Sequence, residues 1–187
     1  MDTTNVHNGM SERAVVAGGC FWCLDAAFRQ LRGVLEVTSG YTGGTTSDPD
    51  YNSVCTGTTG HVEAVSVTFD PSVITYNDLL TVFFGFHDPT SLNRQGNDIG
   101  TEYRSAIFTV NDQQATEAQA MIETLTQNQT FSKPIVTTIE PLTTFYPAES
   151  EHQDFYRKNP GSGYCSVIIS PKLAKLREHF STLLKSN

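Results

Sequence analysis

Charged side chains are scarce in this 187-residue chain: they make up 17% of it, against about 25% in an average globular protein. Basic residues are the scarcer sign, because 12 lysines and arginines stand against 20 aspartates and glutamates and leave a formal net charge of −8. Nucleic acids and anionic membrane surfaces attract basic patches. The acidic balance therefore predicts a protein that binds neither nucleic acid nor membranes.

Long apolar runs are missing as well. The longest uncharged apolar stretch, residues 14–24, has eleven residues including two glycines. A membrane span would need about 18. Residues 1–9 also have neither the basic region nor the apolar region of a signal peptide. We therefore expect a cytoplasmic protein, and we expect it to be a monomer.

Cysteine is the third scarce feature. Four cysteines are too few for the disulfide scaffold of a small secreted domain, yet Cys20 and Cys23 are only three positions apart. This spacing favours redox or metal chemistry in a reducing compartment. A zinc site of four thiolates usually combines two closely spaced cysteine pairs, and neither Cys55 nor Cys165 has a near partner. We therefore expect no metal and no bound cofactor.

The length fits one domain over residues 1–187, with residues 1–12 as a flexible leader. Hydrophobic periodicity predicts strands at 14–17, 34–41, 61–69, 103–110, 135–139 and 164–169, and helices at 20–33, 75–86, 112–127 and 171–183. The first four strands and two helices follow the order β-α-β-β-α-β. The predicted fold class is α/β or α+β, with a mixed sheet, a ferredoxin-like core and flanking helices.

Cys20 stands where a predicted strand ends and a predicted helix begins. Free backbone N–H groups and the helix dipole at such a position favour a thiolate, so Cys20 is a candidate nucleophile. An isolated cysteine there would more often be a small apolar residue that fills the junction. The pair Gly18-Gly19 and the nearby Cys23 reverse that preference, because glycines allow a close approach and the second thiol can form a disulfide with the first.

Glu63 is the second informative position. Strand alternation places it on the same face as Val65, Val67 and Phe69. A carboxylate that extends an apolar face either lies at the sheet margin in water or is desolvated. In the second case its pKa is raised and it can donate a proton.

Each remaining candidate could be functional or could have only a structural role. Two long polar loops, residues 42–60 and 88–101, are candidate binding segments, because long loops in compact domains are often functional. Either could also be a solvated connection, and Tyr51 could be an aromatic laid on the surface. The histidines are expected to be hydrogen-bonded structural residues; they are His61, His87 and His152.

Four ordered motifs resemble those of the A-type peptide methionine sulfoxide reductases, from residue 14 to about 170. They are Gly19-Cys20-Phe21-Trp22, Gly40-Tyr41-Thr42-Gly43-Gly44, Thr59-Gly60-His61-Val62-Glu63-Ala64 with Tyr51 before it, and Arg94-Gln95-Gly96-Asn97-Asp98 with Tyr103-Arg104-Ser105 after it. The resemblance implies an enzyme that reduces the S epimer of methionine sulfoxide, free or in proteins, and so repairs oxidised proteins.

The resemblance also implies roles for individual residues. Cys20 would attack the sulfoxide sulfur, and Glu63 would donate a proton to the oxygen. Four other residues would hold the substrate: Tyr51 and Tyr103 at the oxygen, and Phe21 and Trp22 at the S-methyl group. Asp98 matches the family's substrate-binding aspartate, acting on the methionine backbone or through an ordered water.

A second thiol would convert the resulting Cys20 sulfenic acid into a disulfide, which thioredoxin or a small dithiol would reduce. Cys165 matches a resolving position of the family and follows a mobile Gly-Ser-Gly segment, but a fixed strand is expected after it. Cys23 lies one helical turn from Cys20, where many members have glycine. Both remain open.

The other positions are expected to be structural: Cys55 as a packed loop cysteine, and Asp25 as a replacement for the family's glutamate. The alternatives to the reductase are a thiol-disulfide oxidoreductase that uses Cys20 and Cys23, and a non-catalytic module that binds methionine-containing peptides.

Overall fold

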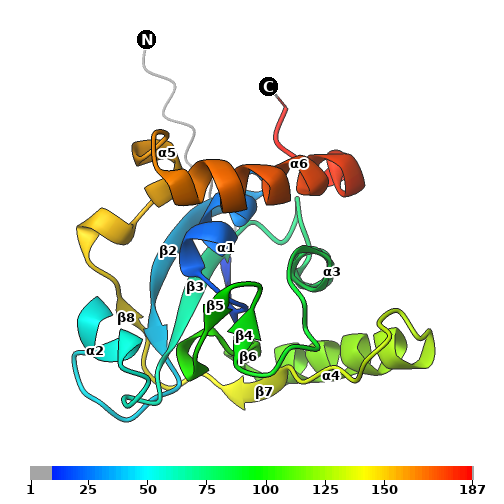
Figure 1. Ribbon diagram of the computed structural model, residues 1–187. Helices are drawn as coiled ribbons and strands as arrows, with labels where there is room; N and C mark the ends of the chain where they lie inside the picture. Colours follow the sequence, from blue (N-terminus) through cyan, green and yellow to red (C-terminus); the bar gives the residue numbers. More distant parts are fainter. Residues whose placement is uncertain (1–9, 187) are drawn as a thin grey trace.

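The computed structural model describes residues 10–186 (Figure 1). Most of the expected leader, residues 1–9, lies outside the described residues, and the first strand begins at Glu12. Six strands form the main sheet in the order β7-β6-β1-β3-β2-β8. Their bounds are β1 Glu12–Ala17, β2 Val34–Thr42, β3 Val62–Phe69, β6 Ala106–Thr109, β7 Thr138–Pro141 and β8 Tyr146–Pro147.

The four central strands of this sheet pair antiparallel in the order β6-β1-β3-β2. Together with α1 (Phe21–Phe28) and α3 (Tyr76–Phe86) they form the β-α-β-β-α-β unit that the sequence predicted. The added strand β7 runs parallel to β6, so the sheet is mixed as expected. The antiparallel hairpin β4 (Arg94–Gln95) and β5 (Asp98–Ile99) stands apart from this sheet.

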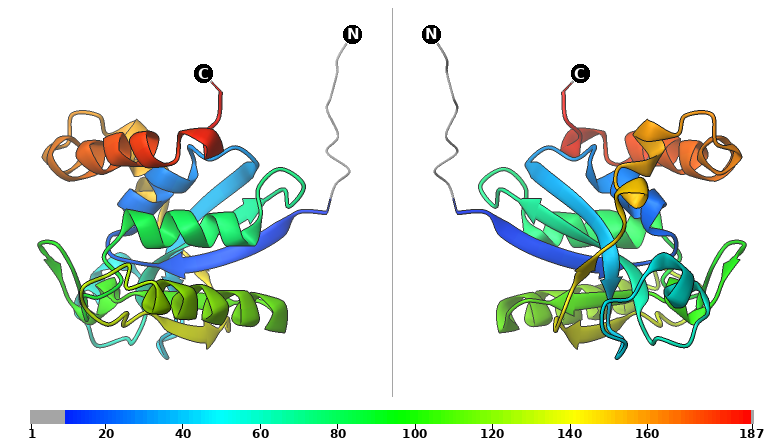
Figure 2. Two further views of the ribbon diagram at one scale, coloured as in Figure 1. Left: turned by 90° about the vertical axis from the view of Figure 1, so that its right-hand side faces the viewer. Right: turned by 90° about the vertical axis from the view of Figure 1, so that its left-hand side faces the viewer.

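Helices cover one face of the sheet and build a second layer upon it. α1 and α3 pack beneath α6 (Ser170–His179), which forms the outer layer in Figure 2, and α4 (Asp112–Gln127) packs against α3, β6 and β7. On the opposite face a smaller core is covered by Leu142 and Phe145. The shorter helices are α2 Tyr51–Cys55, α5 Phe155–Lys158, the 3₁₀ helices at Thr101–Tyr103, Ser150–His152 and Ser181–Leu183, and a π-helical segment at Cys165–Ile169.

Strand alternation decides which side of β3 faces the helices. Val65, Val67 and Phe69 are buried in the core beneath the helices, whereas Val62 and Ala64 face the smaller core on the other side. The predicted alternation is therefore confirmed, and it directs Glu63 toward α1.

The strand predicted at residues 164–169 is wrong: this segment is helical and continues directly into α6. Its burial has a helical period, because Cys165 and Ile169 are buried four positions apart while Val167 is 70% exposed. The β-branched residues favour a strand locally, but packing against the core overrides that preference.

Other predicted boundaries shift. α1 ends at Phe28, five residues before Gly33, because Leu31 instead forms a β-bridge with Leu184. The strand predicted at 103–110 is shorter, since residues 101–103 form a 3₁₀ helix and β6 begins only at 106. The strand predicted at 135–139 is displaced to 138–141. The loop predicted at 42–60 contains α2.

Candidate active site

Cys20 is the N-cap residue of α1, immediately after β1. The residue before it, Gly19, has a φ of +88°, and a Cβ there would lie 2.7 Å from the Cβ of Gln95. Its N–H donates to the backbone oxygen of Tyr103 at 3.2 Å. The glycine therefore lets the loops that contain Gln95 and Tyr103 reach the strand-to-helix junction that presents the thiol.

The side chains of Cys20 and Cys23 share a hydrogen bond. Burial raises the pKa of Cys20, and the hydrogen bond from Cys20 lowers the pKa of Cys23 to about 7. Two hydrogen-bonded thiols titrate as a pair, and this pair loses its first proton near neutral pH. The raised pKa of Cys20 and the lowered pKa of Cys23 place this first thiolate on Cys23, so the ionised thiol expected at Cys20 from its helix-start position is not favoured by its burial.

Glu63 lies at the start of α1, because its Oε2 accepts a hydrogen bond of 2.9 Å from the backbone N–H of Phe21. The side chain is 1% exposed. Burial raises its pKa to about 8, against the hydrogen bond from Phe21, which lowers it. Of the two sequence alternatives the desolvated one holds, so the carboxyl is protonated at neutral pH.

Tyr51 and Tyr103 reach the same region from different elements. Tyr51 is the first residue of α2, and Tyr103 ends the 3₁₀ helix at 101–103. Burial raises the pKa of each phenol, and the charge of Glu63 contributes to both. Both phenols therefore stay protonated and can donate hydrogen bonds.

Aromatic rings form one wall of the site. Phe21 is fully buried and its ring centroid lies 6.5 Å from those of Trp22 and Tyr51. Trp22 stacks on Phe155 at 3.7 Å and donates from Nε1 to Nδ1 of His152 at 3.2 Å. Trp22 is thus held in one orientation from two sides, which gives a small apolar substituent a defined surface to contact.

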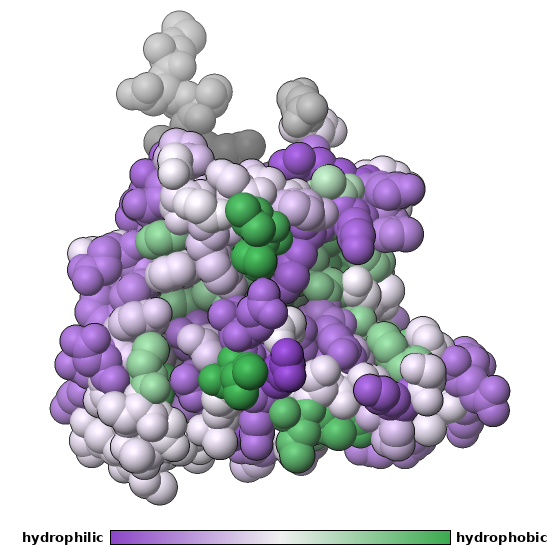
Figure 3. All heavy atoms as spheres, in the orientation of Figure 1, coloured by the Kyte–Doolittle hydropathy of each residue, from purple (hydrophilic) through white to green (hydrophobic). Residues whose placement is uncertain are grey.

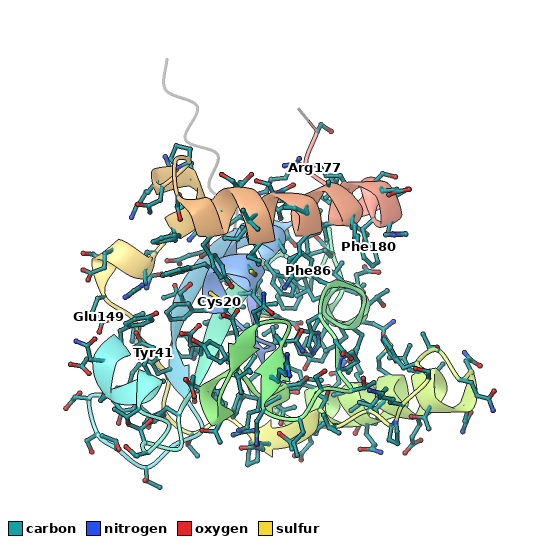
Figure 4. The ribbon with its side chains drawn as sticks, viewed as in Figure 1. Cys20, Tyr41, Phe86, Glu149, Arg177 and Phe180 are labelled. Atoms are coloured by element: carbon teal, nitrogen blue, oxygen red, sulfur yellow. The ribbon has the colours of Figure 1, made fainter. Side chains whose placement is uncertain are left out.

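The sequence did not reveal His152, Glu149 or Phe155 as part of this wall. His152 also stacks on Tyr51 at 4.4 Å. The carboxylate of Glu149 accepts from the backbone N–H of Tyr51 and from the hydroxyl of Tyr41, both at 2.8 Å (Figure 4). These residues fall in a polar stretch without periodicity, so only the fold brings them to the site.

Asp98, on β5, is linked to the cysteine pair through Tyr164. Its Oδ2 accepts a hydrogen bond of 2.7 Å from the hydroxyl of Tyr164, and the same hydroxyl lies 3.8 Å from Sγ of Cys23. Sequence reasoning missed Tyr164; its place directly before Cys165 was the only signal. This tyrosine connects the predicted substrate-binding carboxylate to the thiols.

The other two cysteines lie apart from this pair. Cys165 is 1% exposed, inside the hydrophobic core and within the π-helical segment. Its expected mobility is therefore wrong for this structure, because the residue is fixed by helical backbone bonds and packing. Cys55 was expected to be packed in a loop, but it ends α2 and is exposed, with a hydrogen bond to Tyr51.

The predicted structural residues have partners. His61 accepts from the backbone N–H of Gly44 at 3.0 Å, and His87 is hydrogen-bonded at both ring nitrogens, to Phe83 and Ser105. Burial lowers the pKa of His87 to about 4, so it is neutral.

Residues 10–186 contain neither a metal-binding cluster nor a membrane-spanning helix. No group of three or more histidine, cysteine, aspartate or glutamate side chains that could hold a metal ion occurs in that part of the chain. None of its helices is long and apolar enough to cross a membrane.

Residues 12–184 match the family model of peptide methionine sulfoxide reductase. The chain belongs to this family. A peptide methionine sulfoxide reductase MsrA of Deinococcus radiodurans is 58% identical over 174 residues, which cover 93% of this chain and 84% of that protein. The chain is therefore an oxidoreductase of this family, as its motifs predicted, and the comparison does not favour the thiol-disulfide oxidoreductase alternative.

Solved structures of other reductases agree with the fold. Methionine sulfoxide reductase A of Corynebacterium diphtheriae has a TM-score of 0.77 at 38% identity, covering 80% of this chain and 76% of that one. Mxr1 from Saccharomyces cerevisiae, crystallised in complex with Trx2, has a TM-score of 0.53 at 25% identity, covering 78% and 84%. The mixed sheet with its helices is thus shared with the reductase family.

Proposed function

We propose that this reductase acts on the S epimer of methionine sulfoxide, free or within proteins, and that Cys20 is its nucleophile. The observation that carries the proposal is Glu63, a buried carboxyl whose pKa is raised to about 8 at the helix start that presents Cys20. A sulfoxide oxygen is a poor leaving group until it accepts a proton. A protonated carboxyl beside a cysteine pair that loses its first proton near neutral pH supplies the acid and the sulfur nucleophile of that step.

In the first step the sulfur of Cys20 attacks the sulfoxide sulfur. This attack forms an S–S bond while the oxygen takes a proton from Glu63. The resulting hydroxyl group then moves from the substrate sulfur to the sulfur of Cys20, so that the substrate's S–O bond and the new S–S bond both break. One thiol and one sulfoxide thus become one sulfenic acid and one thioether, methionine. Cys20 gains the oxygen and is oxidised by two electrons, and methionine sulfoxide is reduced by two.

The surrounding residues position the substrate in this proposal. Tyr51 and Tyr103 donate hydrogen bonds to the sulfoxide oxygen, since both phenols remain protonated. Phe21 and Trp22 contact the S-methyl group. Asp98, held by Tyr164, accepts a hydrogen bond from the methionine backbone or from an ordered water.

The second step needs a resolving thiol, and the geometry favours Cys23 over Cys165. Cys23 is hydrogen-bonded to Cys20, and its pKa is lowered to about 7, so it is available as a thiolate. It attacks the sulfur of the Cys20 sulfenic acid and displaces water, which leaves a disulfide. Cys165 would first have to leave the hydrophobic core and unwind its helical segment.

A dithiol partner then returns the disulfide to two thiols, and we propose thioredoxin for this role. The complex of the yeast relative Mxr1 with Trx2 supports it. We further propose that the enzyme works as a monomer in the cytoplasm, whose reducing environment would keep its four cysteines as free thiols, as they are in the structure.

The test is turnover of the separated sulfoxide epimers by Cys20→Ser, with dithiothreitol as reductant. We expect no turnover of either epimer by Cys20→Ser, while the wild type consumes only the S epimer. Cys55→Ser is the matched control, because it removes an exposed thiol outside the reacting pair and is expected to keep turnover. Turnover of the S epimer by Cys20→Ser would exclude the proposed nucleophile.

A further inference from the structure

A groove leads away from the reactive thiols between α3 and α6. Its first part, about 370 Å³, begins at Asp98 and Tyr164, next to the cysteine pair. Its second part, about 390 Å³, extends to His179 and Phe180 near the end of α6. Figure 4 shows Phe86 and Phe180 on the two sides of this region, α3 and the end of α6.

The two parts are neighbours along α6, because they have four lining residues in common. These are Phe86, His87, Asp88 and Lys172. Tyr164 lies between the groove and the active site, because it lines the groove and its hydroxyl contacts Cys23 and Asp98. A chain whose oxidised methionine occupies the site can therefore continue along α6 without leaving the protein surface.

Basic side chains line the groove along α6. Lys172, Lys175 and His179 recur at i, i+3 and i+7, so they share one face of the helix. Lys172 lies over the ring of Phe86, with its ammonium 5.7 Å from the centroid. Two acidic residues also line the groove: Asp88 accepts hydrogen bonds from Thr90 and Ser91, and Asp98 accepts one from Tyr164.

The far part of the groove thus has two lysines, Lys172 and Lys175, against one aspartate, Asp88, in a protein whose net charge is −8. The residues exposed there, Lys175 and His179, have no hydrogen-bond or ion-pair partner within the described part of the chain. Around it the surface is mainly polar, with hydrophobic residues in separate patches (Figure 3). A ligand of this groove would thus be recognised by its charge and not through a broad apolar contact.

We propose that this groove binds the polypeptide that flanks the oxidised methionine and that it selects acidic flanking residues. The inference rests on the proposed function and names its substrate class. From Lys172 to His179 the helix rises about 10 Å, the length of about three residues of extended peptide. The groove therefore selects aspartate or glutamate close to the sulfoxide along the peptide.

The experiment compares kcat/KM for two peptides that carry one S-epimer methionine sulfoxide. One has glutamates two to five positions away on both sides, and the other has glutamines there. We expect the wild type to favour the glutamate peptide about two- to fivefold, the contribution of one exposed ion pair, through KM rather than kcat. The preference should disappear at high salt, which screens such pairs.

Lys175→Glu is the decisive variant, and Arg177→Glu is its matched control. Both reverse one charge on α6, but Arg177 lies outside the groove, at the upper side of α6 in Figure 4, where its Nε donates to Gln30. We expect K175E to abolish or invert the peptide preference and R177E to keep it. Because the ratio of two substrates is unaffected by the fraction of folded enzyme, partial misfolding of K175E does not obscure the result.

The proposal would be overturned if the wild type had the same kcat/KM for both peptides. It would also be overturned if K175E and R177E lost the preference for the glutamate peptide to the same extent. The milder Lys175→Gln should reduce the preference without inverting it. N-acetyl-methionine sulfoxide, which is too short to reach Lys175, separates this inference from the proposed function. If the enzyme reduces that compound but has no preference between the two peptides, only the proposed selection of acidic peptides is contradicted. If it reduces no sulfoxide at all, the proposed function is contradicted.

Discussion

Replacing Glu63 with glutamine separates the chemistry of this residue from its structural role. Glutamine has the shape of the protonated carboxyl, and its oxygen can still accept the hydrogen bond from the N–H of Phe21. It cannot release a proton. Since positioned general acids contribute about 10²- to 10⁴-fold to a rate, we expect Glu63→Gln to lower kcat by that factor.

The same substitution should stabilise the folded protein. The pKa of Glu63 is raised from an ordinary value of 4.5 to about 8 in the folded state. Below pH 4.5 the carboxyl is protonated whether or not the chain is folded. As the pH rises from there toward 8, only the unfolded chain releases the proton, so the wild type loses stability. At about 1.4 kcal/mol per pH unit, this loss amounts to about 3 kcal/mol at pH 7.

Two measurements on the same protein check this reasoning. Urea unfolding at pH 5 and at pH 7 should give a stability difference between Glu63→Gln and the wild type that increases with pH. Steady-state reduction of the S epimer should show wild-type kcat/KM falling above pH 8, as the acid is lost, without such a fall in the variant. A variant with full activity, or with a stability difference independent of pH, would refute a buried proton donor at Glu63.

Three further substitutions test other parts of the site. Cys165→Ser should keep turnover with both thioredoxin and dithiothreitol, because the proposed mechanism uses Cys23 as the resolving thiol; loss of thioredoxin-dependent turnover alone would contradict this. Tyr164→Phe should raise the pKa of Cys23, since the Tyr164 hydrogen bond lowers it, and iodoacetamide labelling against pH should show the shift toward higher pH. Gly19→Ala should lower unfolding stability in urea by at least about 1–2 kcal/mol, because alanine at φ +88° is strained and its Cβ meets Gln95; unchanged stability would refute the packing argument.

The local hydrophobic pattern of the sequence was sufficient to predict the central elements of the fold. The period-2 pattern of residues 62–69 determined which side of β3 faces the helices, and the apolar spacing of residues 21–28 predicted α1. Both signals are strong because each element buries one complete face. The position of Glu63 among apolar neighbours was visible for the same reason.

Long-range packing decided what the sequence could not. Val167, Ile168 and Ile169 favour a strand by propensity, yet they are helical because Ile169 packs into the core. His152 stacks on Tyr51 across about a hundred residues of chain, and no local signal announces such a contact. The choice between Cys23 and Cys165 was open for the same reason, since it depends on how each thiol is packed.

In the proposed mechanism Cys20 takes the oxygen from the sulfoxide, and Cys23 then forms a disulfide with Cys20. The most direct measurement is peptide-mapping mass spectrometry of the reduced wild type after one turnover with the S-epimer sulfoxide and no reductant, trapped with an alkylating agent. We expect one methionine formed per protein and a disulfide between Cys20 and Cys23, with Cys55 and Cys165 alkylated as free thiols. A disulfide between Cys20 and Cys165, or a Cys20 that stays a free thiol after methionine is formed, would contradict this mechanism.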